Sequence, residues 1–207
     1  NQKGLSNLLN RLAYGGTQNY SKEDLVNFYK KIQNGMGFNG NLMKSLTETE
    51  YTFFNIDEIY VNDAISILAD YANNIRFTTE DIEKEVGVIF KDKYYTNQIT
   101  IQKNLLSIFP NSLALNRDII ITTETMKNAT KENLLEFYHN QYQPANMILL
   151  VVGDLNKQEL LKKINSTFGL LKANSIKQNI PVFEAINTKG LVFHYSYNEK
   201  QNHSTIA

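Results

Sequence analysis

The chain has 207 residues, of which 42% are hydrophobic and 20% charged, and its 21 basic residues balance its 21 acidic ones. This length and composition are typical of one globular domain or slightly more, and they exclude extensive disorder. The zero net charge argues against nucleic acid as a main partner, because phosphate binding needs a basic surface. The absence of Cys excludes disulfides and thiolate metal sites, and with only three His a histidine metal site would be hard to assemble.

The N-terminal part of the chain predicts two helices. The leucines of residues 4–14 recur at helical spacing, and a Gly-Gly-Thr sequence ends this segment. Ser21 is followed three positions later by Asp24, a pattern typical of a helix N-cap. We therefore expect one short helix and then one capped helix before residue 35.

A β-hairpin and a long helix are predicted next. Residues 41–45 and 50–56 are expected to pair as strands, because the second segment is rich in aromatic and β-branched residues. The periodicity of residues 57–74 predicts a long helix, with Ile59 among its inward-facing residues.

Further helices are expected from Thr78 or Thr79, over residues 98–109, from Thr123 and Thr130, and over residues 156–168. Residues 147–152 form a continuous apolar run of strand length, which predicts a strand covered on both faces. Helices clustered beside separate hairpin strands indicate an α+β fold.

Local motifs reveal no catalytic constellation. The usual phosphate-binding glycine loops and the G-x-S-x-G sequence of serine hydrolases are absent. The acidic residues at the start of one predicted helix are interpreted as partners of its dipole, and structural or solvated roles are favoured for the histidines. The acidic residues are Glu80, Asp81, Glu83 and Glu85, and the histidines are His139, His194 and His203.

Membrane insertion and secretion find no support in the sequence. No apolar run approaches the roughly 20 residues that a membrane-spanning helix needs. The first residues, Asn-Gln-Lys-Gly, have neither the basic nor the apolar region of a signal peptide, so we expect none in this chain, and the compartment stays open.

One string near the N-terminus carries a resemblance to a known family. Residues 4–17, read as Gly-Leu-Ser-Asn-Leu-Leu-Asn-Arg-Leu-Ala-Tyr-Gly-Gly-Thr, resemble the pattern G-x-x-H-x-x-E-H-x-x-(aromatic)-x-G-T that opens the pitrilysin/insulinase family of zinc peptidases. The glycines, the aromatic residue and the spacing match. Asn7 and Arg11 stand where the family has its two His, and Asn10 stands where it has Glu.

Other segments extend the resemblance in the same order. Residues 41–51 resemble N-A-x-T-S-x-x-x-T-x-Y, and residues 85–92 resemble E-x-x-V-[VI]-x-x-E, where Asp92 replaces the Glu that is the family's third zinc ligand. Residues 137–154 resemble F-[YH]-x-x-x-Y-x-P-x-N-M followed by V-V-G-D. The matches cover most of residues 4–170.

The resemblance implies a pitrilysin-like α+β domain with a mixed, mostly antiparallel sheet and helices packed on it. Residues 1–174 would form this domain without its first strands, residues 175–189 a linker, and residues 190–207 the start of a second homologous domain. The family builds a closed peptide chamber from two halves, and only one of its four domains binds zinc.

The altered positions argue against zinc hydrolysis by this chain. Asn7 and Asn10 offer neutral amides, Asn10 is not a base, and Arg11 carries a fixed positive charge where the metal would sit. Asp92 keeps a carboxylate on a shorter side chain. We expect no bound zinc and no catalytic residue, and we expect Arg11 and Asp92 to form an ion pair across the vacated site.

Three functions remain possible. The first is a zinc-less subunit or half that shapes the peptide chamber beside an active pitrilysin-like partner, with peptide adding as a strand beside Asn41 and Leu42. The second is a structural or assembly protein that kept the fold without peptidase activity. The third is an active enzyme with a rebuilt site, for which no alternative ligand set is visible.

Overall fold

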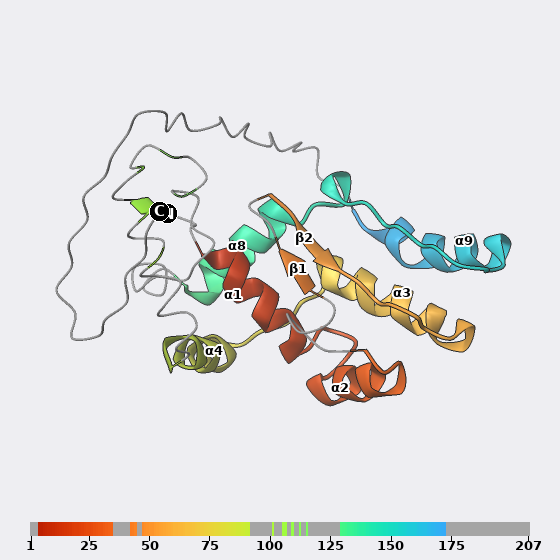
Figure 1. Cartoon of the computed structure of the whole chain (residues 1–207), viewed down its shortest axis with the longest axis horizontal. Helices are drawn as coiled ribbons and strands as arrows, with labels where there is room; N and C mark the ends of the chain where they lie inside the picture. Colours follow the sequence, from red (N-terminus) through yellow and green to blue (C-terminus); the bar gives the residue numbers. More distant parts are fainter. Residues whose placement is uncertain are drawn as a thin grey trace.

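The computed structural model describes residues 4–34, 42–44, 47–91 and 129–172, together with Ile101, Leu105, Leu106, Phe109, Ser112 and Leu115. Figure 1 shows the elements in this order: α1 (Leu5–Leu12), η1 (Ala13–Gly15), α2 (Lys22–Lys31), β1 (Leu42–Lys44), β2 (Thr49–Tyr51), α3 (Glu58–Asn73), α4 (Thr79–Lys91), α8 (Lys131–Gln141), η3 (Pro144–Asn146), α9 (Lys157–Ser166) and η4 (Phe168–Leu170).

Several predictions from the sequence fall wholly or mostly outside these residues. They are the helix over residues 98–109, the helix from Thr123, the linker over residues 175–189 and the start of a second domain over residues 190–207. The predicted division into a domain, a linker and a second domain therefore stays a prediction.

Helix α1 lies at the centre of the core and packs against α4 and α8 (Figure 1). All four of its leucines are buried, and so are the two amide side chains of Asn7 and Asn10, so burial extends around most of the helix. An element buried on several sides needs a partner for each polar group it carries inward. Asn7 and Asn10 of the altered motif therefore lie inside the fold.

Helix α2 begins at the N-cap that the sequence predicts. The Ser21 Oγ accepts from the Asp24 backbone N–H at 3.2 Å, and the Asp24 carboxylate accepts from the Ser21 backbone N–H at 2.9 Å. This reciprocal capping box satisfies backbone donors that the first turn leaves open. The two hydrogen bonds from Ser21 hold the pKa of the Asp24 carboxyl below its ordinary value.

We expect Ser21→Ala to lower the free energy of unfolding by about 1 kcal/mol, the usual effect of losing an N-cap. Because the folded pKa of Asp24 is depressed, its contribution is present above the unfolded value near 3.8 and is lost as the pH falls through the lower folded value. The difference between wild type and Ser21→Ala should therefore shrink below about pH 4. Urea unfolding at neutral and acidic pH measures this. A difference that stays constant into acid would contradict the carboxylate's part in the cap.

Helix α3 confirms the predicted helix over residues 57–74, with one residue misplaced. Ala64, Ile67 and Tyr71 are buried, but Ile59 is 75% exposed, so the prediction that Ile59 faces inward was wrong. Ile59 lies in the first turn, where the helix has not yet reached the core. Further along, the Tyr71 ring stacks on Tyr51 of β2 with ring centroids 4.9 Å apart.

The predicted hairpin is present and short. β1 and β2 pair antiparallel, with Leu42 opposite Tyr51 and Lys44 opposite Thr49. The second strand was expected to continue to residue 56, but strand pairing in the described residues ends at Tyr51. This hairpin is the whole sheet that the described residues form, so the larger mixed sheet expected from the resemblance is not confirmed.

The structure corrects the prediction of a strand covered on both faces at residues 147–152. Within the described residues this segment pairs with no strand, and Ile148, Leu150 and Val152 are 95%, 80% and 85% exposed. Alternate residues are thus open to solvent, which is the geometry of an extended segment with one uncovered face. The apolar composition of this segment predicts a strand that is buried on both faces. Composition does not identify the neighbouring element that would bury it.

None of the helices in the described ranges combines the length and the apolar character that a bilayer crossing requires.

Candidate functional site

The three altered positions of the family motif all lie on α1, where the sequence places them. Asn7 and Arg11 are one helical turn apart, and Asn10 lies between them on the neighbouring side. The structure brings these positions against β2, α4 and α8, which come from distant parts of the sequence. The contacts of Asn10 and Arg11 show what each replacement does.

Asn10 is fully buried and links three segments through its amide. Its Oδ1 accepts from the Tyr142 hydroxyl at 2.8 Å and from the Tyr51 hydroxyl at 3.2 Å. Its Nδ2 lies 3.4 Å from the Thr49 Oγ1, to which it donates. The amide oxygen and nitrogen are both engaged in holding α1 to β2 and to the residue after α8. At the family's general-base position, this side chain is a structural link.

The phenols around Asn10 remain protonated under ordinary conditions. Burial raises the pKa of the Tyr51 hydroxyl well above its usual value. Burial also raises the pKa of Tyr142, against the opposing effect of hydrogen bonds with Thr49 and Ser6. Both phenols therefore act as donors to the Asn10 oxygen, and neither is prepared to serve as a base.

Arg11 forms an ion pair with an acid that sequence analysis assigned to another role. Its Nε donates to the Glu85 Oε2 at 2.9 Å, and the two side chains are 21% and 25% exposed. Glu85 was interpreted as a partner of the α4 dipole, but it lies beyond the first turn and faces α1. The expected pair with Asp92 stays a prediction, since Asp92 lies outside the described residues.

The described part of this site does not fit a zinc ion. A zinc site of this kind needs two imidazoles and a carboxylate around the metal, with a base beside it. Here the amide of Asn10 is committed to hydrogen bonds, and Arg11 contributes a permanent cation. No group of three or more His, Asp or Glu that could hold a metal occurs among the residues that the structure describes.

A second polar cluster beside the motif was missed by sequence reasoning. Asp70 is 4% exposed, and its carboxylate accepts from the Thr17 Oγ1 at 2.6 Å, the Asn19 Nδ2 at 2.8 Å and the Asn74 Nδ2 at 2.9 Å. The sequence signal was an acid on the apolar face of a predicted helix, next to Tyr71.

This cluster explains the Gly-Thr that ends the family motif. Gly16 adopts φ 134°, and a Cβ there would lie 3.3 Å from the Tyr20 carbonyl oxygen. Thr17 follows at once and binds Asp70, so the glycine turns the chain and the threonine anchors it. These two residues of the motif serve the fold and not the chemistry.

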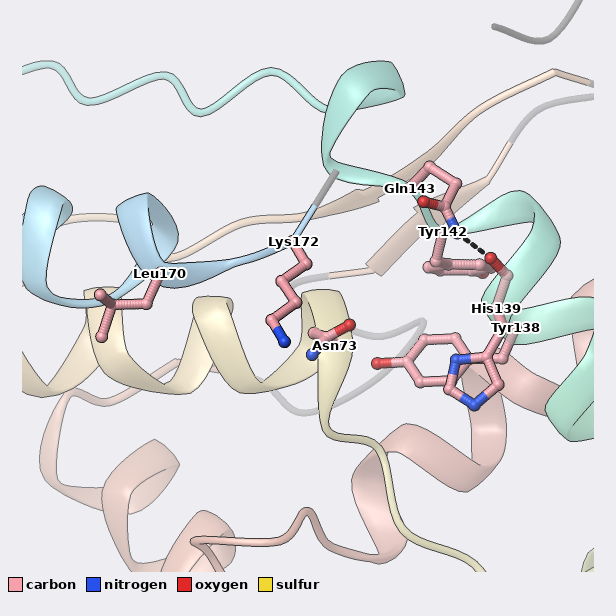
Figure 2. A pocket seen from close by; sticks show the side chains of 7 residues that line it. All are labelled: Asn73, Tyr138, His139, Tyr142, Gln143, Leu170 and Lys172. Atoms are coloured by element: carbon pink, nitrogen blue, oxygen red, sulfur yellow. Dashed lines mark hydrogen bonds between the residues drawn. The ribbon is translucent and has the colours of Figure 1, made fainter. Parts of the chain in front are cut away.

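A polar cavity of about 410 Å³ lies beside Tyr142, between the ends of α3 and α8 and residues 170–172. Figure 2 shows the Lys172 ammonium and the His139 ring pointing toward it, near Asn73 at the end of α3. Its other polar groups are used internally: the Tyr138 hydroxyl donates to the Tyr71 carbonyl at 3.0 Å, and Gln143 Nε2 donates to the His139 carbonyl.

The Lys172 ammonium at this cavity complements the partial negative charges of the helix C-termini there. No acid is among its lining residues, so the cavity itself offers no carboxylate for acid–base or metal chemistry. The prediction of a structural or solvated role for His139 is consistent with this placement, at the last turn of α8.

Of the two predicted peptide-binding residues, one lies within the described residues. Leu42 is the first residue of β1, opposite Tyr51, and Asn41 lies outside the described residues. Through β2, this strand is joined to the segment that carries Thr49 and Tyr51, the partners of Asn10. The expected binding strand and the altered motif are therefore neighbours in the structure.

Comparison with known proteins identifies the family of the chain. A family model described as "Insulinase (Peptidase family M16)" matches residues 1–123, and one described as "Peptidase M16 inactive domain" matches residues 128–207. The chain is 26% identical to "Probable zinc protease PqqL" of Haemophilus influenzae, over 86% of this chain and 19% of that protein. It is 23% identical to "Mitochondrial-processing peptidase subunit beta" of Dictyostelium discoideum, over 86% of this chain and 38% of that protein.

Solved structures share the fold. The first half of the periplasmic protease PqqL from Escherichia coli superposes with a TM-score of 0.68 and 25% identity, over 88% of this chain and 40% of that one. The chain therefore spans about a fifth to two fifths of the length of these relatives. The model for the insulinase family matches more than half of the 207 residues. The chain belongs to the insulinase family of peptidases, family M16, and has its pitrilysin-like fold.

Proposed function

We propose that this chain is a zinc-less part of an M16-type peptidase, which shapes the peptide-binding chamber beside an active half or subunit. The observation that carries the proposal is the set of contacts made by Asn10 and Arg11 on α1, the helix that contains the altered motif. Asn10 is engaged in hydrogen bonds to Tyr142, Tyr51 and Thr49, and Arg11 is paired with Glu85. In this chain these positions stabilise the fold. In the active members of the family, the same positions bind zinc and supply the general base.

Two features support a partner. The relatives are longer than this chain, and one is named as a subunit and another as the first half of a protease. In addition, residues 148, 150 and 152 present Ile, Leu and Val to solvent along an extended segment. Native proteins usually cover such an edge with another strand or element, because its backbone groups and apolar side chains would otherwise pair indiscriminately. A neighbouring half of the peptidase is the proposed cover.

The substrate role proposed for this chain is strand addition. An extended peptide can add to an exposed sheet edge through main-chain hydrogen bonds, and β1 is the strand proposed to receive it, through Asn41 and Leu42. The alternative is a structural or assembly protein that kept the same fold. The two functions differ in one observable respect, which is whether an active, zinc-containing peptidase accompanies the chain.

The test measures zinc by mass spectrometry and peptidase activity, for the purified chain and for complexes pulled down with it from its native extract. We expect no stoichiometric zinc in the chain alone, and chelator-sensitive peptidase activity with zinc in the complex. Leu150→Lys at the exposed segment should lower recovery of that activity several-fold, because a charge would be buried against the partner. Val88→Lys, at an exposed position of α4, is the matched control and should leave recovery unchanged.

The outcomes separate the candidates. A complex without zinc or peptidase activity would favour the assembly role. Stoichiometric zinc in the isolated chain would show that Asn7, Asn10 and Arg11 do not prevent metal binding, and would overturn the proposal.

A further inference from the structure

The ion pair between Arg11 and Glu85 is the one charged contact that joins α1 to α4 among the residues the structure describes. The two residues are separated by 74 positions in sequence, and their side-chain atoms meet at 2.9 Å. Beneath them the two helices pack through the buried core, with leucines from α1 and with Ile82 and Ile89 from α4. The pair therefore lies at the edge of an apolar interface, where water has limited access.

The charge at position 11 is permanent. A guanidinium does not lose its proton in proteins, so Arg11 stays positive at every pH at which the protein is folded. A divalent cation placed between Asn7 and Glu85 would meet this charge at close range, in surroundings that screen it less than bulk water does. Glu85, the acid that accepts a hydrogen bond from Arg11, already has a cation as its partner.

Metal ions in proteins also have a mechanical role, because ligands from separate elements become linked through one centre. In this chain the two imidazoles are missing from α1, yet a cation and a carboxylate still bridge the same helix to α4. We propose that the Arg11 guanidinium replaces a metal ion here: it links α1 to α4 through Glu85, and its charge excludes divalent cations from the site. This inference rests on the proposed absence of zinc but not on the proposed chamber role.

The alternative is an incidental surface pair. Fully exposed ion pairs contribute little to stability, because water screens them and two long side chains must be ordered. The present pair is three-quarters or more buried on each side and spans two elements. A linking role predicts that breaking it destabilises the fold and that the two residues act as a unit, whereas an incidental pair predicts neither.

The first experiment is a double-mutant cycle followed by thermal unfolding. Arg11→Gln and Glu85→Gln should each lower Tm by about 3–5 °C, and the double variant should fall no further than the worse single one. Arg76→Gln, which removes an exposed arginine, is the matched control and should shift Tm by less than about 1 °C. Additive effects of the two substitutions, or single effects no larger than that of the control, would overturn the linking role.

The second experiment tests exclusion of the cation with zinc itself, and with cobalt as a spectroscopic probe. Asn7→His restores one imidazole but keeps Arg11, whereas Asn7→His/Arg11→His places two imidazoles one turn apart and removes the charge. We expect zinc to raise the Tm of the double variant by several degrees, with cobalt absorption typical of tetrahedral coordination, and to leave Asn7→His unchanged.

Zinc binding by Asn7→His alone would overturn the exclusion by charge. So would a folded double variant that fails to bind zinc, because something other than Arg11 would then close the site. If the double variant does not fold, the mutant cycle on Arg11 and Glu85 decides the proposal through its linking role. Zinc in the unmodified chain would contradict both this inference and the proposed function, whereas a failed mutant cycle would affect this inference alone.

Discussion

Asp70→Ala should lower the free energy of unfolding by about 3–4 kcal/mol, the largest effect that we expect from a single polar substitution. The carboxylate is 4% exposed and accepts hydrogen bonds from Thr17, Asn19 and Asn74. It joins the turn after α1 to the end of α3. Alanine would leave the buried Thr17 hydroxyl without its acceptor and would remove the acceptor of the exposed Asn19 and the half-buried Asn74, so the turn at Gly16 would lose its anchor.

Thermal unfolding measures this effect. A loss of this size corresponds to a fall in Tm of about 10 °C for a chain of this length. Asp63→Ala is the matched control, since Asp63 lies on the same helix with an exposed side chain and should change Tm by about 1 °C or less. Equal Tm values for the two variants would show that the carboxylate of Asp70 does not anchor the turn.

Asn10→Ala is expected to lower the free energy of unfolding by about 2–3 kcal/mol. Its amide accepts from Tyr142 and Tyr51 and donates to Thr49, so truncation leaves three hydroxyl groups without this partner. Burial keeps the two phenols protonated, so they cannot adapt by ionising. The result would establish that the family's general-base position has a structural role in this chain.

Urea unfolding provides the measurement, with Asn62→Ala as the matched control. Asn62 is exposed on α3, and alanine favours a helix, so this variant should be neutral or slightly more stable. Tyr142→Phe removes one donor and should cost about 1 kcal/mol. An Asn10→Ala variant as stable as wild type would mean that the amide is not the link between α1, β2 and α8.

The family resemblance and the local elements could be predicted from particular residues. Leucine spacing placed α1, the Ser21–Asp24 pattern placed the start of α2, and the apolar periodicity before Asn74 placed α3. Local signals of this kind succeed because helix periodicity and capping depend on residues a few positions apart. The motif positions were found for the same reason, since Asn7, Asn10 and Arg11 share one helix.

The partners of those residues could not be predicted in the same way. The structure pairs Arg11 with Glu85 on α4, a contact that the sequence did not indicate. The expected pair with Asp92 stays a prediction, because Asp92 lies outside the described residues. The hydrogen bonds of Asn10 reach Thr49 and Tyr142, which are 39 and 132 positions away. Contacts at such separations depend on how helices pack, and no periodicity within a single element encodes them.

The sequence by itself determined the family, the positions of α1, α2 and α3, and the replacement of the residues at the family's zinc-binding positions on α1, because each of these depends on local patterns. Only the tertiary structure decided what the altered residues do instead. It showed that Asn10 contacts the residue after α8 and Arg11 contacts α4, that Asp70 binds the threonine of the Gly-Thr turn, and that the apolar segment at residues 147–152 lacks cover within the described residues. The physical reason is that burial and pairing belong to the assembled core, in which each side chain meets residues that are distant in the chain.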